Sequence, residues 1–177
     1  MSLSLLLALN IASVSAQTEQ GRFGLSGSIS GSVRHDSNGG SGDYSISLSP
    51  GGLYFVADAL ALTPSVSFGY EHLPPSRYLS GSATLGLTYY FGKEELKPLV
   101  SCALGTSHSN DRVGKATYIE DHWMFRAEGG VAWFVKNSVA LTGTLRYEFT
   151  DTYQSSFYIY DMNVLRLLIG VTYIWPK

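Results

Sequence analysis

The chain alternates between apolar and polar positions with a period of two over most of its length. In the stretch FGLSGSISGSVR (23–34), apolar residues or glycine alternate with glycine, serine and arginine. This period places one kind of residue on each face of a β-strand. The pattern predicts eight strands, at about 22–34, 43–56, 59–72, 78–91, 97–108, 122–135, 139–150 and 163–175.

The connections between these strands alternate in length. Short turns are predicted near 57–58, 92–95 and 136–138, and longer polar loops at 35–42, 73–77, 109–121 and 151–162. Each short turn follows an aromatic triplet: Tyr54-Phe55-Val56, Tyr90-Phe91-Gly92 or Trp133-Phe134-Val135. Three aromatic-ended hairpins are therefore expected to close at one end of the sheet.

Strands of roughly ten residues with one apolar face, joined by short turns at one end and longer loops at the other, are typical of membrane barrels. An open sheet edge in hydrocarbon would leave backbone groups without hydrogen bonds, so the sheet must close. We therefore predict an all-β fold, an eight-stranded antiparallel up-and-down transmembrane β-barrel. A soluble lipocalin-like barrel would turn its apolar face inward. The other face here is Ser, Thr and Gly with few Lys, which disfavours that alternative.

Aromatic residues form two bands, as the two membrane interfaces would select. The band near the short turns contains Tyr54, Tyr89, Phe91, Trp133, Tyr173 and Trp175, and the band near the long loops contains Phe68, Tyr70, Trp123, Phe125, Tyr147 and Phe149.

The first sixteen residues, MSLSLLLALNIASVSA, carry no charge and end in small residues. They predict a signal peptide (1–16) cleaved before Gln17, followed by a barrel domain (17–177). Beyond this segment no apolar run is long enough for a membrane-spanning helix.

Cys102 is the only cysteine, so no intrachain disulfide can form. The net charge of −2, without a basic stripe, indicates no nucleic-acid partner.

The stretch SLSPGGLYFVADALALTPSVSFGYEH (47–72) resembles the second and third strands of bacterial outer-membrane β-barrel domain proteins, the OmpA/OmpX-like small barrels. The resemblance implies an integral protein of the Gram-negative outer membrane. Its partners would be outer-membrane lipid, lipopolysaccharide and the barrel insertion machinery, and the chain would be a monomer. Two features depart from the family pattern: Ala59 stands where the turn usually has Asn, and Pro176-Lys177 follow the terminal aromatic residue.

The same parity places charged side chains inside the barrel. A turn near Asn137 would set Glu128 almost opposite Arg146, with Glu148 in reach of Arg126 or Arg166. An eight-stranded barrel is just wide enough for such side chains to fill it. We favour a salt-bridged network that fills the interior, and a narrow ion or small-solute pore is the alternative. The predicted inward charged residues are Arg34, Glu71, Arg126, Glu128, Arg146, Glu148 and Arg166.

The sequence predicts no cofactor, metal site or catalytic residue. The four histidines, His35, His72, His108 and His122, fall at the long-loop end, where interface positions are expected. SHSND (107–111) is similar to the His-x-Ser-Asn of the outer-membrane lipid A deacylase, but adjacent residues of a strand face opposite ways. We expect a non-enzymatic role in envelope integrity or in contact with a surface ligand through the long loops. A lipid-modifying enzyme is a further alternative.

Overall fold

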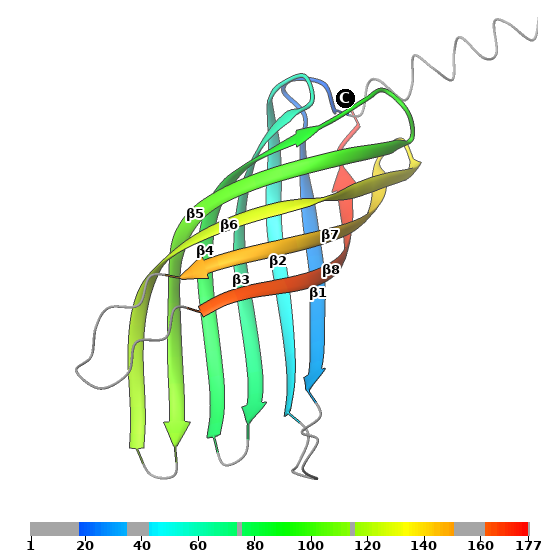
Figure 1. Ribbon diagram of the computed structural model, residues 1–177. Coiled ribbons are helices and arrows are strands. Elements are labelled where there is room, and N and C mark those ends of the chain that lie inside the picture. The colour runs from blue at the N-terminus through cyan, green and yellow to red at the C-terminus, as the bar shows by residue number, and fades with distance from the viewer. Residues whose placement is uncertain (1–17, 35–42, 74–75, 114–115, 151–161, 177) are drawn as a thin grey trace, which may run out of the picture.

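The computed structural model describes residues 18–34, 43–73, 76–113, 116–150 and 162–176. In these residues eight antiparallel strands form a closed barrel, in which each strand pairs with the next and β8 pairs with β1 (Figure 1). The predicted fold and the three short turns are confirmed. No helix in the described part of the chain is long and apolar enough to cross a membrane. The strands are β1 (Phe23–Arg34), β2 (Asp43–Ala57), β3 (Leu60–Leu73), β4 (Ser76–Tyr90), β5 (Leu96–Val113), β6 (Ala116–Lys136), β7 (Val139–Thr150) and β8 (Met162–Ile174).

Two of the predicted long loops are wrong. β3 and β4 pair as far as Leu73↔Ser76, and β5 and β6 pair as far as Val113↔Ala116. The segment between 109 and 121 is polar and lacks an apolar face, so its sequence does not indicate a strand. Alternation is required only where one face of a strand is buried, and the backbone ladder continues without it. The other two predicted loops, 35–42 and 151–162, fall almost wholly outside the described residues.

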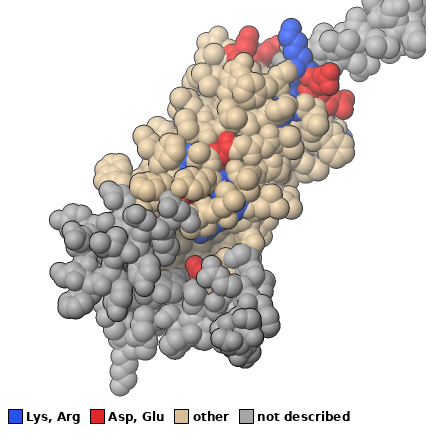
Figure 2. All heavy atoms as spheres, viewed as in Figure 1, with Lys and Arg blue, Asp and Glu red and all other residues tan. Residues whose placement is uncertain are grey.

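Large apolar side chains cover the outer surface of the barrel. Trp123, Leu167 and Ile169 are 72%, 68% and 66% exposed, and the outward positions of every strand are similar. In Figure 2, uncharged residues cover most of the barrel wall, and many of the visible charged side chains gather at the short-turn end. An apolar surface of this extent suits hydrocarbon and not water. The apolar face therefore points away from the interior, opposite to a lipocalin-like barrel. Ten of the twelve residues in the two predicted aromatic bands are exposed, and the other two, Tyr70 and Trp175, are half-buried.

A second apolar layer closes the interior at the short-turn end, which the sequence analysis did not predict. The rings of Phe55 and Tyr90 lie 5.8 Å apart, and those of Tyr90 and Phe134 lie 6.5 Å apart. Lys97 is 1% exposed among them, and its Nζ donates to the Gly92 carbonyl oxygen at 3.2 Å. We call this layer the apolar plug; it consists of Leu53, Phe55, Ala61, Tyr90, Leu99, Ala132, Phe134, Ala140 and Ile174.

The apolar plug corrects the aromatic repeat inferred from the sequence. In Tyr54-Phe55-Val56 the outer residues are exposed and Phe55 is buried, and Trp133-Phe134-Val135 repeats this arrangement. The matching copy, Tyr89-Tyr90-Phe91 at the end of β4, starts one residue earlier than the predicted triplet. Each repeat therefore gives two side chains to the membrane interface and one to the plug.

The short-turn end also joins the two ends of the barrel. Arg22, just before β1, donates from Nε and Nη2 to the carbonyl oxygen of Trp175 at 3.2 and 2.8 Å. The backbone N–H of Gly21 donates to the Phe55 carbonyl oxygen at 2.8 Å. These contacts fix the entry of β1 against the end of β8 and over the plug.

Ala59, at the turn between β2 and β3, has a φ of 63°. This is the left-handed region, which Asn tolerates better than other side chains and which costs about 1–2 kcal/mol for an L-residue. The conformation is held by neighbouring backbone, since the Ala59 N–H donates to the Thr18 oxygen and its own oxygen accepts from the Tyr90 N–H. The departure from the family pattern at this turn thus carries local strain.

We expect Phe134→Ala to destabilise the folded barrel by about 3–5 kcal/mol, because it removes a ring from the packed interior and leaves a cavity. Urea unfolding in detergent micelles, followed by heat-modifiable migration on a gel, measures the change. Phe68→Ala is the matched control, because that ring is 59% exposed on the outer surface. Equal losses in the two variants would show that the plug does not stabilise the barrel.

Candidate functional site

Five of the seven charged residues predicted to face inward come together inside the barrel. Arg126 and Glu128 lie on β6, Arg146 and Glu148 on β7, and Arg166 on β8. We call these five the charge cluster. The turn at 137–138 sets Glu128 opposite Arg146 and Arg126 opposite Glu148 in the ladder. Each of these residues alternates with an outward apolar neighbour, so strand parity alone brings the charges to one side.

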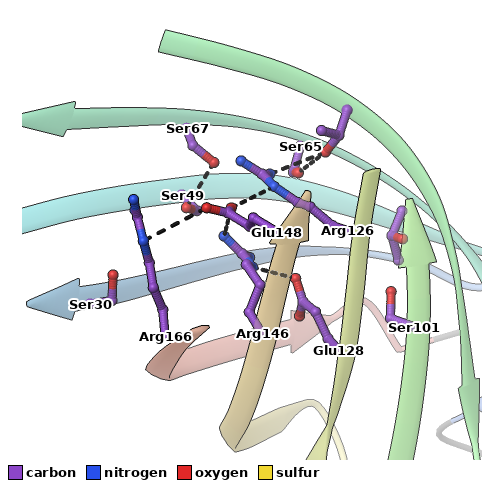
Figure 3. A network of polar contacts seen from close by, with 12 residues as sticks. Ser30, Ser49, Ser65, Ser67, Ser101, Arg126, Glu128, Arg146, Glu148 and Arg166 are labelled. Atoms are coloured by element: carbon purple, nitrogen blue, oxygen red, sulfur yellow. Dashed lines mark hydrogen bonds and ion pairs between the residues drawn. The ribbon is translucent and has the colours of Figure 1, made fainter. Parts of the chain in front are cut away.

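Glu148 lies at the centre of the charge cluster, between three arginines (Figure 3). Its Oε1 is 2.8 Å from Arg126 Nε and 3.6 Å from Arg146 Nη1, and its Oε2 is 3.7 Å from Arg166 Nε. The Arg126 contact is an ion pair by distance, although its Nε–H makes no well-aligned hydrogen bond. Arg146 Nε also donates to Glu128 Oε1 at 2.6 Å. One carboxylate is therefore shared, while the other has a close partner of its own.

Arg126 also reaches across the interior to β4. Its Nη2 donates to Ser82 Oγ at 2.8 Å, and its Nη1 donates to Thr84 Oγ1 at 3.4 Å. The residue is only 3% exposed. A buried guanidinium needs polar partners, and here Glu148 on β7 and the two hydroxyl groups on β4 supply them. Arg126 thus connects β6 to β4 through the interior.

The wall of the barrel formed by β1 to β5 carries paired hydroxyl groups. This is the small polar face that the sequence showed on the early strands, and it leaves room for the long charged side chains of β6 to β8. The oxygen–oxygen distances are 2.7 Å for Ser30–Ser47, 2.9 Å for Ser49–Ser67, 2.8 Å for Ser65–Thr84 and 3.0 Å for Thr88–Ser101.

A cavity of about 120 Å³ lies between the hydroxyl wall and the charge cluster. Arg126, Glu128 and Arg146 line one side of it, and Tyr90 and Leu99 of the apolar plug also line it. A polar cavity of this size has room for a few water molecules, which would hydrogen-bond to the hydroxyl groups. The interior is therefore polar in its middle and apolar at the short-turn end.

The remaining two predicted residues are not part of the charge cluster as the structure describes it. Glu71 lies on β3 in register with Ser45 and Tyr78, and among the described residues no ion pair joins it to the five. Arg34 pairs through its backbone with Asp43 at the end of β1, and its side chain lies outside what the structure describes. The charge cluster itself has three arginines and two glutamates, a formal charge of 3 − 2 = +1.

Sequence reasoning missed two buried cations at the short-turn end, Arg22 and Lys97. Arg22 precedes the first alternating segment, so parity gave it no direction. Lys97 follows the β4–β5 turn, where a polar residue is ordinary. Strand parity was the signal that could have found Lys97. It lies two residues before Leu99, so both side chains share the inward face of β5, and Leu99 belongs to the apolar plug.

The described histidines, His72, His108 and His122, lie on β3, β5 and β6. His108 Nδ1 lies 2.7 Å from Asp121 Oδ1, and both side chains are exposed. Ser109 belongs to the opposite face of the strand, so no Ser–His pair forms. The ring of His72 lies 5.3 Å from that of Tyr44. His35 lies outside the described residues, and no group of three metal-binding side chains occurs in the described ranges.

Comparison with solved structures places this fold among small outer-membrane barrels. Neisserial surface protein A matches with a TM-score of 0.66 at 16% identity, covering 87% of this chain and 97% of its own. The N-terminal barrel domain of Pseudomonas aeruginosa OprF gives 0.60 at 16%, covering 88% and 98%. Ail of Yersinia pestis gives 0.54 at 13%, covering 88% and 99%. No family model matches the chain, and no curated protein matches it.

These neighbours are outer-membrane β-barrels of the OmpA/OmpX-like kind, so the resemblance inferred from the sequence is confirmed at the level of fold. Their identities to this chain are too low to carry over a function or a site.

We expect Arg146→Ala to destabilise the barrel by about 3–5 kcal/mol, because it leaves Glu128 without its closest partner and removes one of the three arginines around the buried Glu148. The temperature at which the folded gel band converts to the unfolded one provides the measurement. The double variant Glu128→Gln/Arg146→Gln removes both charges and should recover part of this loss. An unchanged transition temperature in Arg146→Ala would exclude the cluster as a stabilising network.

Proposed function

We propose that the protein is an integral outer-membrane barrel with no enzymatic activity and an interior closed to ions. Its role is in envelope integrity or surface contact. The observation that carries this proposal is the two-layer filling of the interior, with the charge cluster in the middle and the apolar plug at the short-turn end. The five residues of the charge cluster are the polar filling in this proposal, and we propose that Arg34 and Glu71 add to it from β1 and β3.

The apolar plug argues against the narrow pore. An ion crossing the barrel would have to pass Phe55, Tyr90 and Phe134, which are 0%, 6% and 3% exposed. Transferring an ion past apolar side chains without water is very unfavourable. Tyr90 and Leu99 of this layer line the end of the polar cavity, so water within the cavity would not by itself make a path.

The β5–β6 hairpin supports a role in surface contact. These strands have 18 and 21 residues, whereas about 9–11 residues cross the hydrocarbon. At about 3.3 Å per residue, the remaining residues extend roughly 20 Å or more beyond it. Ail, a barrel of the same fold, has been described in a phospholipid nanodisc and with the heparin analogue sucrose octasulfate. By analogy, we assign contact with lipopolysaccharide or a surface ligand to the projecting hairpin.

Export and insertion complete the proposal. Residues 1–16 act as a cleaved signal peptide, residues 17–177 form the barrel domain, and the insertion machinery assembles it as a monomer. Trp175 supports a role for the last strand in assembly, because it stacks on Phe23 at 4.9 Å and contacts Tyr173 at 5.1 Å. The terminal aromatic residue thus keeps its outward place although Pro176 and Lys177 follow it.

In planar bilayers the purified protein should produce no steady conductance steps above the lipid background, because the apolar plug excludes ions. An outer-membrane porin recorded under the same conditions is the control for insertion and sensitivity. Reproducible unitary steps from heat-modifiable, folded protein would contradict the closed interior and favour the pore.

An epitope inserted after Val113 should be labelled by antibody on intact cells, because the β5–β6 hairpin projects from the cell surface. The same epitope inserted after Asn137, in a short turn at the other end, should be labelled only in permeabilised cells. Flow cytometry measures both variants. Labelling of the Asn137 insertion on intact cells would reverse the proposed orientation.

A further inference from the structure

The ladder that closes the barrel covers only half of its height. β1 pairs with β8 from Gly24↔Ile174 to Ile29↔Ile169. Beyond this point, and among the residues that the structure describes, Ser30–Arg34 pair with β2 alone and Met162–Leu168 pair with β7 alone. Figure 1 shows β8 turning away from β1 toward its first residues. We call these two edges the unpaired seam.

The unpaired seam lies within the apolar outer surface. Leu165, Leu167 and Ile169 on β8 are 64%, 68% and 66% exposed, as expected for lipid contact. In hydrocarbon, each backbone group without a hydrogen-bond partner costs several kcal/mol. The seam is therefore a place where a polar group entering from the side would be stabilised by the protein edges.

Arg166 supplies the charge at this seam. It lies on the β8 edge between Leu165 and Leu167, points inward, and its side chain is 34% exposed, against 4% for Arg126 and 8% for Arg146. Its only ion pair among the described residues is the 3.7 Å contact with Glu148, a carboxylate that lies closer to Arg126 and Arg146. The formal +1 of the charge cluster thus falls mainly on Arg166.

We propose that the unpaired seam is a lateral binding site for an anionic amphiphile from the surrounding bilayer. The negatively charged head enters between β1 and β8 and pairs with Arg166, which offers the forked donors that bind carboxylate and phosphate oxygens well. The acyl chain remains outside, along Leu165, Leu167 and Ile169. The head also accepts hydrogen bonds from backbone N–H groups of the seam that pair with none of the described strands.

The lateral site rests on the proposed membrane location of the barrel, but it does not depend on whether the interior is closed to ions. A lateral site at the seam needs no path through the plug, so conductance and seam measurements succeed or fail separately.

The first test measures whether the seam is unpaired. In a Cys102→Ser background, Gly31→Cys/Leu167→Cys places thiols where a continued ladder would set them opposite each other. Gly27→Cys/Val171→Cys is the control, because this pair is in register in the closed half. Oxidation should link the control pair at least about tenfold faster, since opposite Cβ atoms in a ladder lie about 4.5–5.5 Å apart. Equal rates would overturn the proposal. A disulfide that joins residue 31 of one molecule to residue 167 of another would also overturn it, because a second copy of the protein would then occupy the seam.

The second test measures the occupant. Native mass spectrometry of the folded protein in detergent should show binding of oleate but not of oleyl alcohol, which has the same chain and no charge. Arg166→Gln should weaken oleate binding about tenfold or more, as loss of a charged hydrogen bond predicts, and Arg166→Lys should restore much of it. Lys136→Gln, at the exposed short turn, is the matched charge control. Equal binding of oleate and oleyl alcohol, or undiminished binding in folded Arg166→Gln, would overturn the proposal.

Discussion

The structure depends on one constraint: in hydrocarbon, backbone N–H and C=O groups must find hydrogen-bond partners within the protein. The constraint explains why the strands form a barrel, why β8 returns to β1, and why the alternating side chains can turn apolar residues outward. It also determines where charge is tolerated. Because the outer surface contacts lipid, the interior is the polar environment that remains along the membrane-spanning strands. Arginine and glutamate lie there, at inward positions of β6 to β8.

The interior then has two kinds of filling with different physical roles. Buried ion pairs add little net stability relative to apolar packing, but they are costly to break and specific in geometry. Arg126 illustrates this, since it pairs with Glu148 on the neighbouring strand β7 and donates to Ser82 on β4, two strands away. The apolar plug contributes packing of the ordinary kind, with Phe55, Tyr90 and Phe134 in contact. One layer fixes which strands face each other, and the other excludes water from one end.

Much of this fold could be predicted from the sequence, because period-two alternation and a short turn together determine which side chains share a face and which lie opposite. The placement of Glu128 opposite Arg146 needed only the turn near Asn137. The β5–β6 extension could not be predicted, since a strand outside the membrane needs no apolar face. The plug was missed because Phe55 and Phe134 sit between girdle residues in an all-apolar triplet, where alternation gives no contrast. The incomplete β1–β8 ladder leaves no local trace, because it depends on how two distant strands diverge.

The contact between Arg22 and the Trp175 carbonyl joins residues 153 positions apart. Neighbouring strands can pair as soon as both are available, but this closing contact requires the segments on both sides of all eight strands. Contacts of such long sequence separation carry the largest loop-closure cost and form late. Until β8 arrives, the sheet has two free edges, and the charges of β6 and β7 lack Arg166 beside them. Barrel closure is therefore the final event in folding, because the β1–β8 ladder joins the first strand to the last.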